Sequence, residues 1–138
     1  MKHNLIPLAN QLEFWLKKLN AIEPPPPEII GYNFGLFELE NGYSIYLIGA
    51  KKYSKYDDDW ACNEDYSPKE RYLKIPIEYD FEDYNDALIT IKRTIEAVLS
   101  DGTMDETFIK KAEYITIGFD DSDLLEVEIG PQQITTIK

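Results

Sequence analysis

The stretch "IIGYNFGLFELENGYSIYLIGAKKY", residues 29–53, decides the fold, because it holds two apolar runs on either side of Asn41-Gly42. In the first run large apolar residues alternate with small or polar ones, as in a strand with one buried face. The second run is apolar on both faces, which indicates a central position in its sheet. An Asn-Gly pair favours a type I′ turn, whose central residues both take positive φ. The sequence therefore predicts an antiparallel hairpin, with strands at about 30–39 and 43–51.

Two apolar stripes at helical spacing lie outside this hairpin. The first runs from Leu5 to Leu19 and predicts a helix that must end before Pro24–Pro27, because prolines cannot continue it. We interpret the proline run as a stiff connector rather than as a ligand for a proline-reading domain. Asp83 or Asn85 can cap the second helix. Its apolar stripe comprises Tyr84, Leu88, Ile91, Ile95, Val98 and Leu99.

The remaining segments complete an α+β domain. Residues 52–71 lack a regular period and are predicted to form a long loop. Residues 72–77 are predicted to form a short strand, with Pro76 placing it at an edge or marking a strand end, because proline cannot donate to a neighbour. A brief helical turn is expected at 105–112, followed by two strands at 113–119 and 124–130 around a turn. We predict a single domain with an antiparallel sheet built from hairpins and two main helices: an N-terminal helix at 1–22, a connector at 23–28 and a body at 29–138.

The composition limits the possible partners. The 138 residues carry 26 acidic and 14 basic side chains, a net charge of −12. Such a chain repels nucleic acids and anionic membranes and attracts basic partners. The chain has no apolar run of about 18 residues, so no membrane span is expected. Its first residues do not form a signal-peptide core, and we expect a cytoplasmic location.

Familiar catalytic and metal-binding patterns are missing from the sequence. Cys62 is the only cysteine and His3 the only histidine, so neither a nucleophile–base pair nor a zinc site is indicated. The acids at 57–59 are consecutive and lack the glycine that a calcium loop needs. No glycine-rich phosphate loop is present. We therefore predict no enzyme activity, no metal and no cofactor, with an uncharacterised carboxylate-dependent enzyme as a less favoured alternative.

The acidic residues gather in one part of the chain. Residues 56–86 hold eleven acidic and three basic residues, a net charge of −8, together with several aromatic residues. Aromatic anchors in an acidic field are typical of a surface that attracts and then holds a basic partner. The alternative is that Trp60 folds back to fix the loop while the aspartates are merely solvated. The predicted partner-binding residues are Asp57, Asp58, Asp59, Trp60, Glu64, Asp65 and Tyr66.

The run from Gly31 to Leu73, with "ENGYSIYLIG" followed by "DDDWACNEDYSPKERYL", resembles small acidic bacterial immunity proteins of polymorphic-toxin systems. The SUKH superfamily is a candidate by its size and α+β character, although its usual N-terminal pattern is not evident. The resemblance implies a protein without catalytic activity that neutralises a cognate toxin, often a basic nuclease, by covering its active site or a nearby surface.

We therefore expect a cytoplasmic immunity protein that binds a basic toxin domain. The first alternative is a general regulatory or adaptor domain that binds another protein through the same loop. A purely structural subunit is a further alternative, and a large apolar interface would indicate it.

Overall fold

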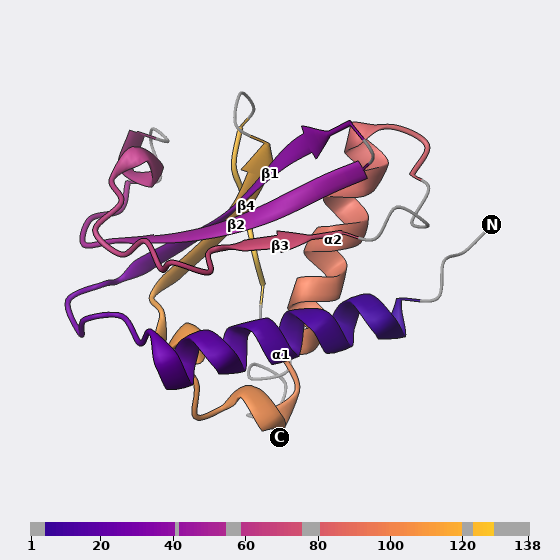
Figure 1. Cartoon of the computed structure of the whole chain (residues 1–138). Coiled ribbons are helices and arrows are strands. Elements are labelled where there is room, and N and C mark those ends of the chain that lie inside the picture. Colours follow the sequence, from indigo (N-terminus) through magenta and orange to yellow (C-terminus); the bar gives the residue numbers. More distant parts are fainter. Residues whose placement is uncertain (1–4, 41, 55–58, 76–80, 120–122, 129–138) are drawn as a thin grey trace, which may run out of the picture.

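A computed structural model describes residues 5–40, 42–54, 59–75, 81–119 and 123–128 (Figure 1). The predicted α+β class is confirmed, with two helices and a five-stranded sheet. The elements are α1 (Ile6–Ile22), β1 (Gly31–Leu39), β2 (Gly42–Ala50), β3 (Tyr72–Lys74), α2 (Tyr84–Leu99), β4 (Tyr114–Phe119) and β5 (Leu125–Glu126), with short 3₁₀ helices at Asp59–Cys62, Gly102–Met104 and Phe108–Lys111.

The strands lie in the order β3-β2-β1-β4-β5. The predicted hairpin is confirmed, since β1 and β2 pair antiparallel along their whole length. The strand predicted at 72–77 forms at Tyr72–Lys74 and lies at the edge, as β3 pairs only with β2 among the described strands; residues 76–77 lie outside the described residues. One pairing differs from the expected antiparallel pattern, because β4 runs parallel to β1. A parallel neighbour needs a crossover connection, and the chain through β3 and α2 provides it.

The turn between β1 and β2 lies one residue earlier than predicted. Gly42 pairs with Leu39 and thus belongs to β2, rather than to the centre of the turn as predicted. Glu40 does not take positive φ, as a type I′ turn would require, whereas Gly42 has a φ of 125°. The left-handed conformation therefore falls on the glycine, where no side chain opposes it. Asn41 itself lies outside the described residues.

The main core lies between the sheet and the two helices, which cover the same side of it (Figure 1). Tyr32, Phe34 and Leu36 alternate along β1 and point into this core. Trp15 of α1 packs edge-on against Phe34, and its indole N–H donates to the Glu70 carbonyl at 2.7 Å. The predicted stripe of α1 is thus confirmed from Leu8 onwards, with Leu8, Leu12, Trp15, Leu16 and Leu19 buried. The helix predicted at 1–22 begins at Ile6, so its first predicted apolar residue, Leu5, is a partly buried N-cap, and residues 1–4 lie outside the described residues.

The second helix begins where its cap predicts. Asp83 accepts a hydrogen bond from the Asp86 N–H at 2.8 Å, and the helix continues to Leu99. The predicted stripe is wrong at its first position, because Tyr84 is 63% exposed. Tyr84 lies in the first turn, where its ring packs edge-on against Phe119 at the end of β4 and otherwise faces solvent. The helical turn predicted at 105–112 forms as Phe108–Lys111 only. The strand predicted at 124–130 forms only at Leu125–Glu126; residues 127–128 are described but lie outside the strand, and residues 129–130 lie outside the described residues.

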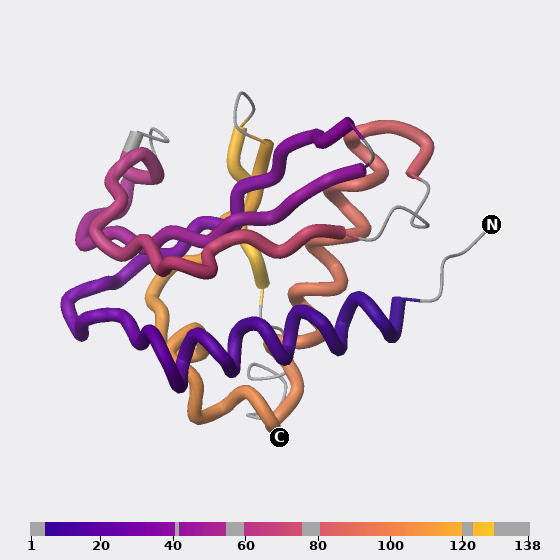
Figure 2. The backbone as a smooth tube through the Cα atoms, in the orientation of Figure 1, coloured from indigo at the N-terminus to yellow at the C-terminus, as the bar shows by residue number. Residues whose placement is uncertain are grey.

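The opposite side of the sheet, which we call the outer face, carries no described α-helix. After β2 the chain leaves the sheet and returns beside it to form β3 (Figure 2). Along this return Tyr66 bridges to Gly49, and the Leu47 N–H donates to the Arg71 carbonyl. The long loop between β2 and β3 is therefore attached to the strand that precedes it. None of the described helices is long and apolar enough to cross a membrane.

Candidate functional site

Trp60 holds the loop between β2 and β3 onto the outer face. Its side chain is only 4% exposed and lies on Gly31 of β1, where an added Cβ would come within 3.2 Å of the indole. Tyr53 packs edge-on against the indole, with ring centroids 5.1 Å apart. Of the two alternatives for Trp60, the structure therefore has the one in which the ring folds back. Its predicted role as an exposed anchor is wrong, because Gly31 leaves an apolar site that the indole fills.

Tyr66 is buried as well, with 7% of its surface exposed. Its hydroxyl donates to the Glu23 carbonyl at 2.7 Å, and its backbone forms two hydrogen bonds of 2.9 Å with Gly49. Burial, and to a lesser extent Glu23, raises the pKa of this hydroxyl well above its usual range. The expected anchor role is therefore wrong for Tyr66 too, since its apolar ring and polar tip both have partners inside the fold.

The described acids of the loop remain on the surface. Glu64 and Asp65 are exposed, and Asp65 accepts a hydrogen bond from the Lys51 N–H at 2.9 Å. Asp57 and Asp58 lie outside the described residues, and Asp59 is described only through its backbone, which begins a 3₁₀ helix. Among the predicted site residues, the structure thus brings Glu64 and Asp65 together on one exposed loop held by Trp60.

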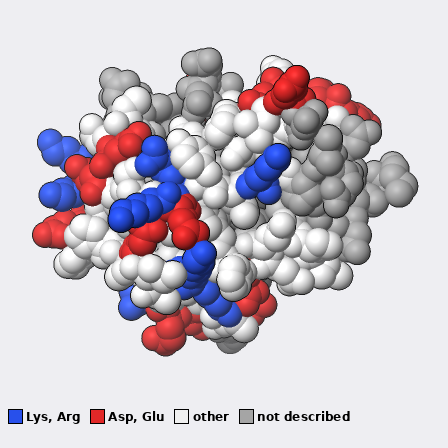
Figure 3. Space-filling view, viewed as in Figure 1, with Lys and Arg blue, Asp and Glu red and all other residues white. Residues whose placement is uncertain are grey.

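The acidic segment 56–86 does not form one continuous field in the described structure. Near the loop, Lys18 pairs with Glu70 at 2.9 Å, and acidic and basic side chains lie intermixed (Figure 3). A second acidic group lies around Tyr43, whose pKa is raised by burial and then by Glu38, Asp83 and Asp86. Tyr43 and the bridge at Gly49 are six residues apart on β2, or roughly 20 Å. The two acidic groups therefore present separate surfaces.

Three aromatic rings lie together on the outer face, and we call them the tyrosine patch: Phe37, Tyr46 and Tyr72. Their centroids are 5.9 to 6.2 Å apart. Tyr46 lies across Gly35 of β1, where a Cβ would collide with its ring. Tyr72 is 53% exposed, and the Arg71 guanidinium lies 5.0 Å from its centroid. This patch is the largest group of partly exposed aromatic rings on the described outer face.

The tyrosine patch is not among the binding residues predicted from the sequence. Tyr46 lies in the run whose apolar residues on both faces predict a central strand, and its side chain is only partly buried in the structure. A usable signal was the position of Tyr72 at the start of an edge strand, where side chains on the outer face have few neighbours. The register that places Tyr46 beside both Gly35 and Tyr72 is a property of the assembled sheet.

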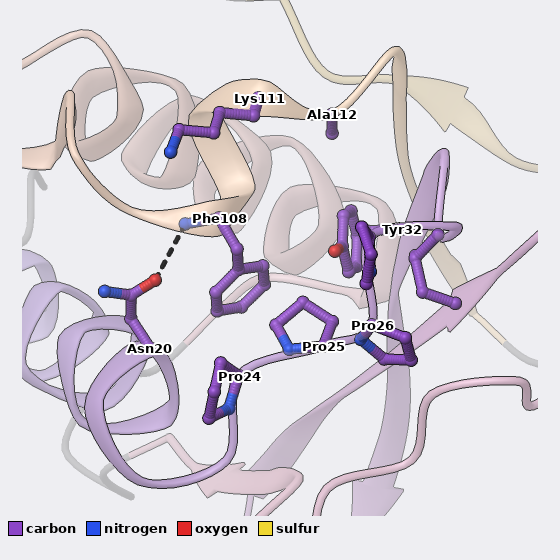
Figure 4. Close-up of a pocket in the computed structure, with 10 residues that line it drawn as sticks. Asn20, Pro24, Pro25, Pro26, Tyr32, Phe108, Lys111 and Ala112 are labelled. Carbon is purple, nitrogen blue, oxygen red and sulfur yellow. Dashed lines mark hydrogen bonds between the residues drawn. The ribbon is translucent and has the colours of Figure 1, made fainter.

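A hollow of about 320 Å³ opens on the core side of the sheet, between the proline run and the 3₁₀ helix Phe108–Lys111. Figure 4 shows the rings of Phe108, Pro25 and Tyr32 gathered around it, while the Phe108 N–H donates to the Asn20 side chain at 2.9 Å. Its walls are mainly apolar, with Lys111 as the charged side chain at its rim. The hollow therefore suits apolar contacts better than acid–base chemistry.

The part of the chain that the structure describes holds no group of three or more His, Cys, Asp or Glu side chains placed to bind a metal ion. Cys62 is a free, exposed thiol. Comparison of the chain with protein-family models, curated proteins and solved structures finds no match in any of the three.

Proposed function

We propose that the protein is a binding protein without catalytic activity that neutralises a basic toxin domain, in the manner of an immunity protein. The observation that carries this proposal is the tyrosine patch, an ordered aromatic surface beside a fixed loop with exposed acids. Immunity by binding requires a preformed surface, and both parts of this surface are held by the sheet beneath them.

The tyrosine patch supplies the anchor. Tyrosine is enriched among the residues that dominate binding energy, because it offers apolar area and a hydroxyl at a low entropic cost. Phe37, Tyr46 and Arg71 surround Tyr72, so its ring is positioned before a partner arrives. Trp60 and Tyr66 act indirectly, by fixing the loop.

The loop acids supply the attraction. Glu64 and Asp65 are exposed, and Asp57, Asp58 and Asp59 precede them in the sequence. Carboxylates around an interface raise the association rate with a positively charged partner more than they raise affinity. The net charge of −12 favours the same class of partner.

The anchor and the loop lie on the same face of the sheet. Trp60 lies on Gly31 and Tyr46 lies across Gly35, and side chains four residues apart in a strand point to the same side. The two positions are separated by roughly 13 Å along β1. One partner surface of ordinary size can therefore contact both.

Co-expression with the product of the adjacent reading frame tests the proposal. That product is induced in a heterologous host, alone and together with this protein, and growth is measured. We expect the product alone to arrest growth and this protein to restore it. A neighbour that arrests growth equally in the presence of this protein would contradict the proposal. Complex formation with a neighbour that is not toxic would favour the regulatory or adaptor alternative instead.

A pair of variants locates the interface within the same assay. Tyr72→Ala removes the exposed ring of the patch, and we expect it to weaken growth rescue. Tyr84→Ala is the matched control, because Tyr84 is also exposed but contacts Phe119 rather than the patch. Equal growth rescue by the two variants would show that the tyrosine patch is not part of the interface.

A further inference from the structure

A second hollow, of about 250 Å³, opens where the loop after β2 meets β4 and β5. We call it the glutamate pocket. Its size admits a side chain, since one water molecule occupies only about 30 Å³. The residues that line it are Tyr53, Glu113, Tyr114, Ile115, Glu126 and Val127.

The walls of the glutamate pocket are fixed by backbone hydrogen bonds. The N–H groups of Glu113 and Tyr114 both donate to the Ile30 carbonyl, at 2.9 and 3.1 Å. On the other wall the Val127 N–H donates to the Ile115 carbonyl at 2.9 Å. The side chains of Glu113 and Glu126 are therefore attached to backbone that is held by these hydrogen bonds and by the pairing of β4 with β5.

The aromatic side of the pocket is also ordered. Tyr53 and Tyr114 stack with centroids 3.7 Å apart and planes inclined by 9°. Trp60 packs against the same Tyr53 ring. Trp60, which helps to fix the acidic loop, is therefore also in contact with a wall of the pocket.

Two negative charges of the pocket lack a partner within the described chain. Glu113 and Glu126 are exposed, and neither carboxylate forms an ion pair or hydrogen bond with another described residue. Lys51 and Lys52 directly precede Tyr53 but are not among the lining residues. The described lining thus combines two acids with stacked aromatic rings and contains no cation.

We propose that the glutamate pocket binds the guanidinium group of an arginine on the partner protein. This inference rests on the proposed function and identifies the side chain that the basic partner contributes. An arginine side chain pairs with carboxylates through several N–H donors and stacks its planar group on aromatic rings. A lysine ammonium offers a compact charge without the planar stacking surface, and so fits this lining less well.

Titration with single-residue analogues tests the pocket without any partner. NMR spectra of isotopically labelled protein are recorded with Nα-acetyl-arginine-N-methylamide, with the neutral citrulline equivalent and with the lysine equivalent. We expect saturable shifts at Tyr53, Tyr114 and Glu126 with the arginine analogue. The lysine analogue should bind several-fold more weakly, and the citrulline analogue should produce no saturable shift. Equal binding of arginine and lysine, or of arginine and citrulline, would overturn the assignment.

Variants link these shifts to the two carboxylates. Glu113→Gln combined with Glu126→Gln should weaken arginine binding about fivefold, as expected for two exposed charge pairs. The matched control is Glu28→Gln combined with Glu106→Gln, which removes the same charge from exposed positions outside the pocket. Unchanged binding in the pocket variant, or equal weakening in the control, would also overturn the inference.

The inference and the proposed function fail separately. If the protein restores growth but does not bind the arginine analogue, the assignment of the glutamate pocket is refuted and the immunity role stands. If arginine binding is saturable and depends on Glu113 and Glu126 but the protein does not restore growth, the immunity role is refuted and the assignment of the pocket stands.

Discussion

Replacement of Trp60 by alanine tests how the loop between β2 and β3 is held. The side chain is 96% buried and contacts Gly31 and Tyr53, so the variant removes one of the contacts that fix the loop. If Trp60 is a core residue, the change lowers the free energy of unfolding substantially. If the indole were a solvent-exposed anchor, the change would leave stability nearly intact.

The magnitude follows from the buried area. Removing roughly 200 Å² of apolar surface at ~25 cal/mol per Å² corresponds to about 5 kcal/mol, as an upper bound. Truncations of buried Phe or Trp cost about 3–5 kcal/mol. Trp60 lies beneath a loop that can partly close over the cavity, and we therefore expect a loss of about 3 kcal/mol, near the lower end. For a chain of this length that loss lowers the melting temperature by about 10 °C.

Urea denaturation followed by circular dichroism measures this change, and differential scanning calorimetry provides the melting temperature. Tyr72→Ala is the control, because its ring is 53% exposed and its loss should cost less than about 1 kcal/mol. A loss below about 1 kcal/mol for Trp60→Ala would refute the reasoning. That result would mean that the indole is exposed in solution and available to a partner.

Three further predictions concern the fold. Burial raises the pKa of Tyr32 and Tyr66 above the ordinary value of 10.0. Stability should therefore be intact below about pH 10 and fall at higher pH, because the unfolded chain ionises first. Tyr66→Phe should reduce this alkaline loss of stability in urea titrations, and an unchanged dependence of stability on pH would contradict the role given to Tyr66. The buried Thr116 hydroxyl donates to the Asn33 side-chain oxygen at 2.9 Å. Thr116→Val should therefore lower the free energy of unfolding by about 1–3 kcal/mol. Unchanged stability would mean that Asn33 accepts from another donor. Asp83→Ala should destabilise the protein by about 1 kcal/mol through loss of the α2 cap. Asp83→Asn keeps an acceptor oxygen and should retain most of the stability. Equal losses of stability in the two variants would show that the Asp83 side chain does not act as the cap.

Local patterns in the sequence predict most of the elements. The alternation before and after Asn41 predicts β1 and β2, and the stripe from Leu5 to Leu19 predicts α1, because periodicity reports which residues each element buries. The parallel pairing of β4 with β1 is not predictable in this way. It depends on how α2 crosses the sheet, which the spacing of apolar residues along β4 does not encode.

The candidate site is predicted less well, because exposure is a property of the assembled surface. Trp60 and Tyr66 lie in a polar, acidic stretch and therefore suggest surface anchors. Each is buried by residues distant in sequence: Gly31 leaves room for the indole, and Glu23 accepts the phenol hydroxyl. Conversely, Tyr72 follows a charged run and stays exposed, because β3 is an edge strand with only three residues.

The association rate with the adjacent-gene product, measured at low and high salt, tests the central claim most directly. The perturbation is the triple variant Asp57→Asn, Asp58→Asn and Asp59→Asn. The control is Glu28→Gln, Glu40→Gln and Glu106→Gln, which removes the same charge from exposed positions elsewhere on the described surface. Each loop charge at about 10 Å from a partner charge contributes about 0.4 kcal/mol in water.

At low salt the three charges together therefore correspond to a rate change of about five- to tenfold, which falls to about twofold at physiological ionic strength. We predict that the loop variant associates five- to tenfold more slowly at low salt, with a flatter salt dependence and a nearly unchanged dissociation rate, and that the control differs little from the wild type. Identical association rates for the loop variant and the wild type at both salt concentrations would contradict the claim that this acidic loop meets a basic partner.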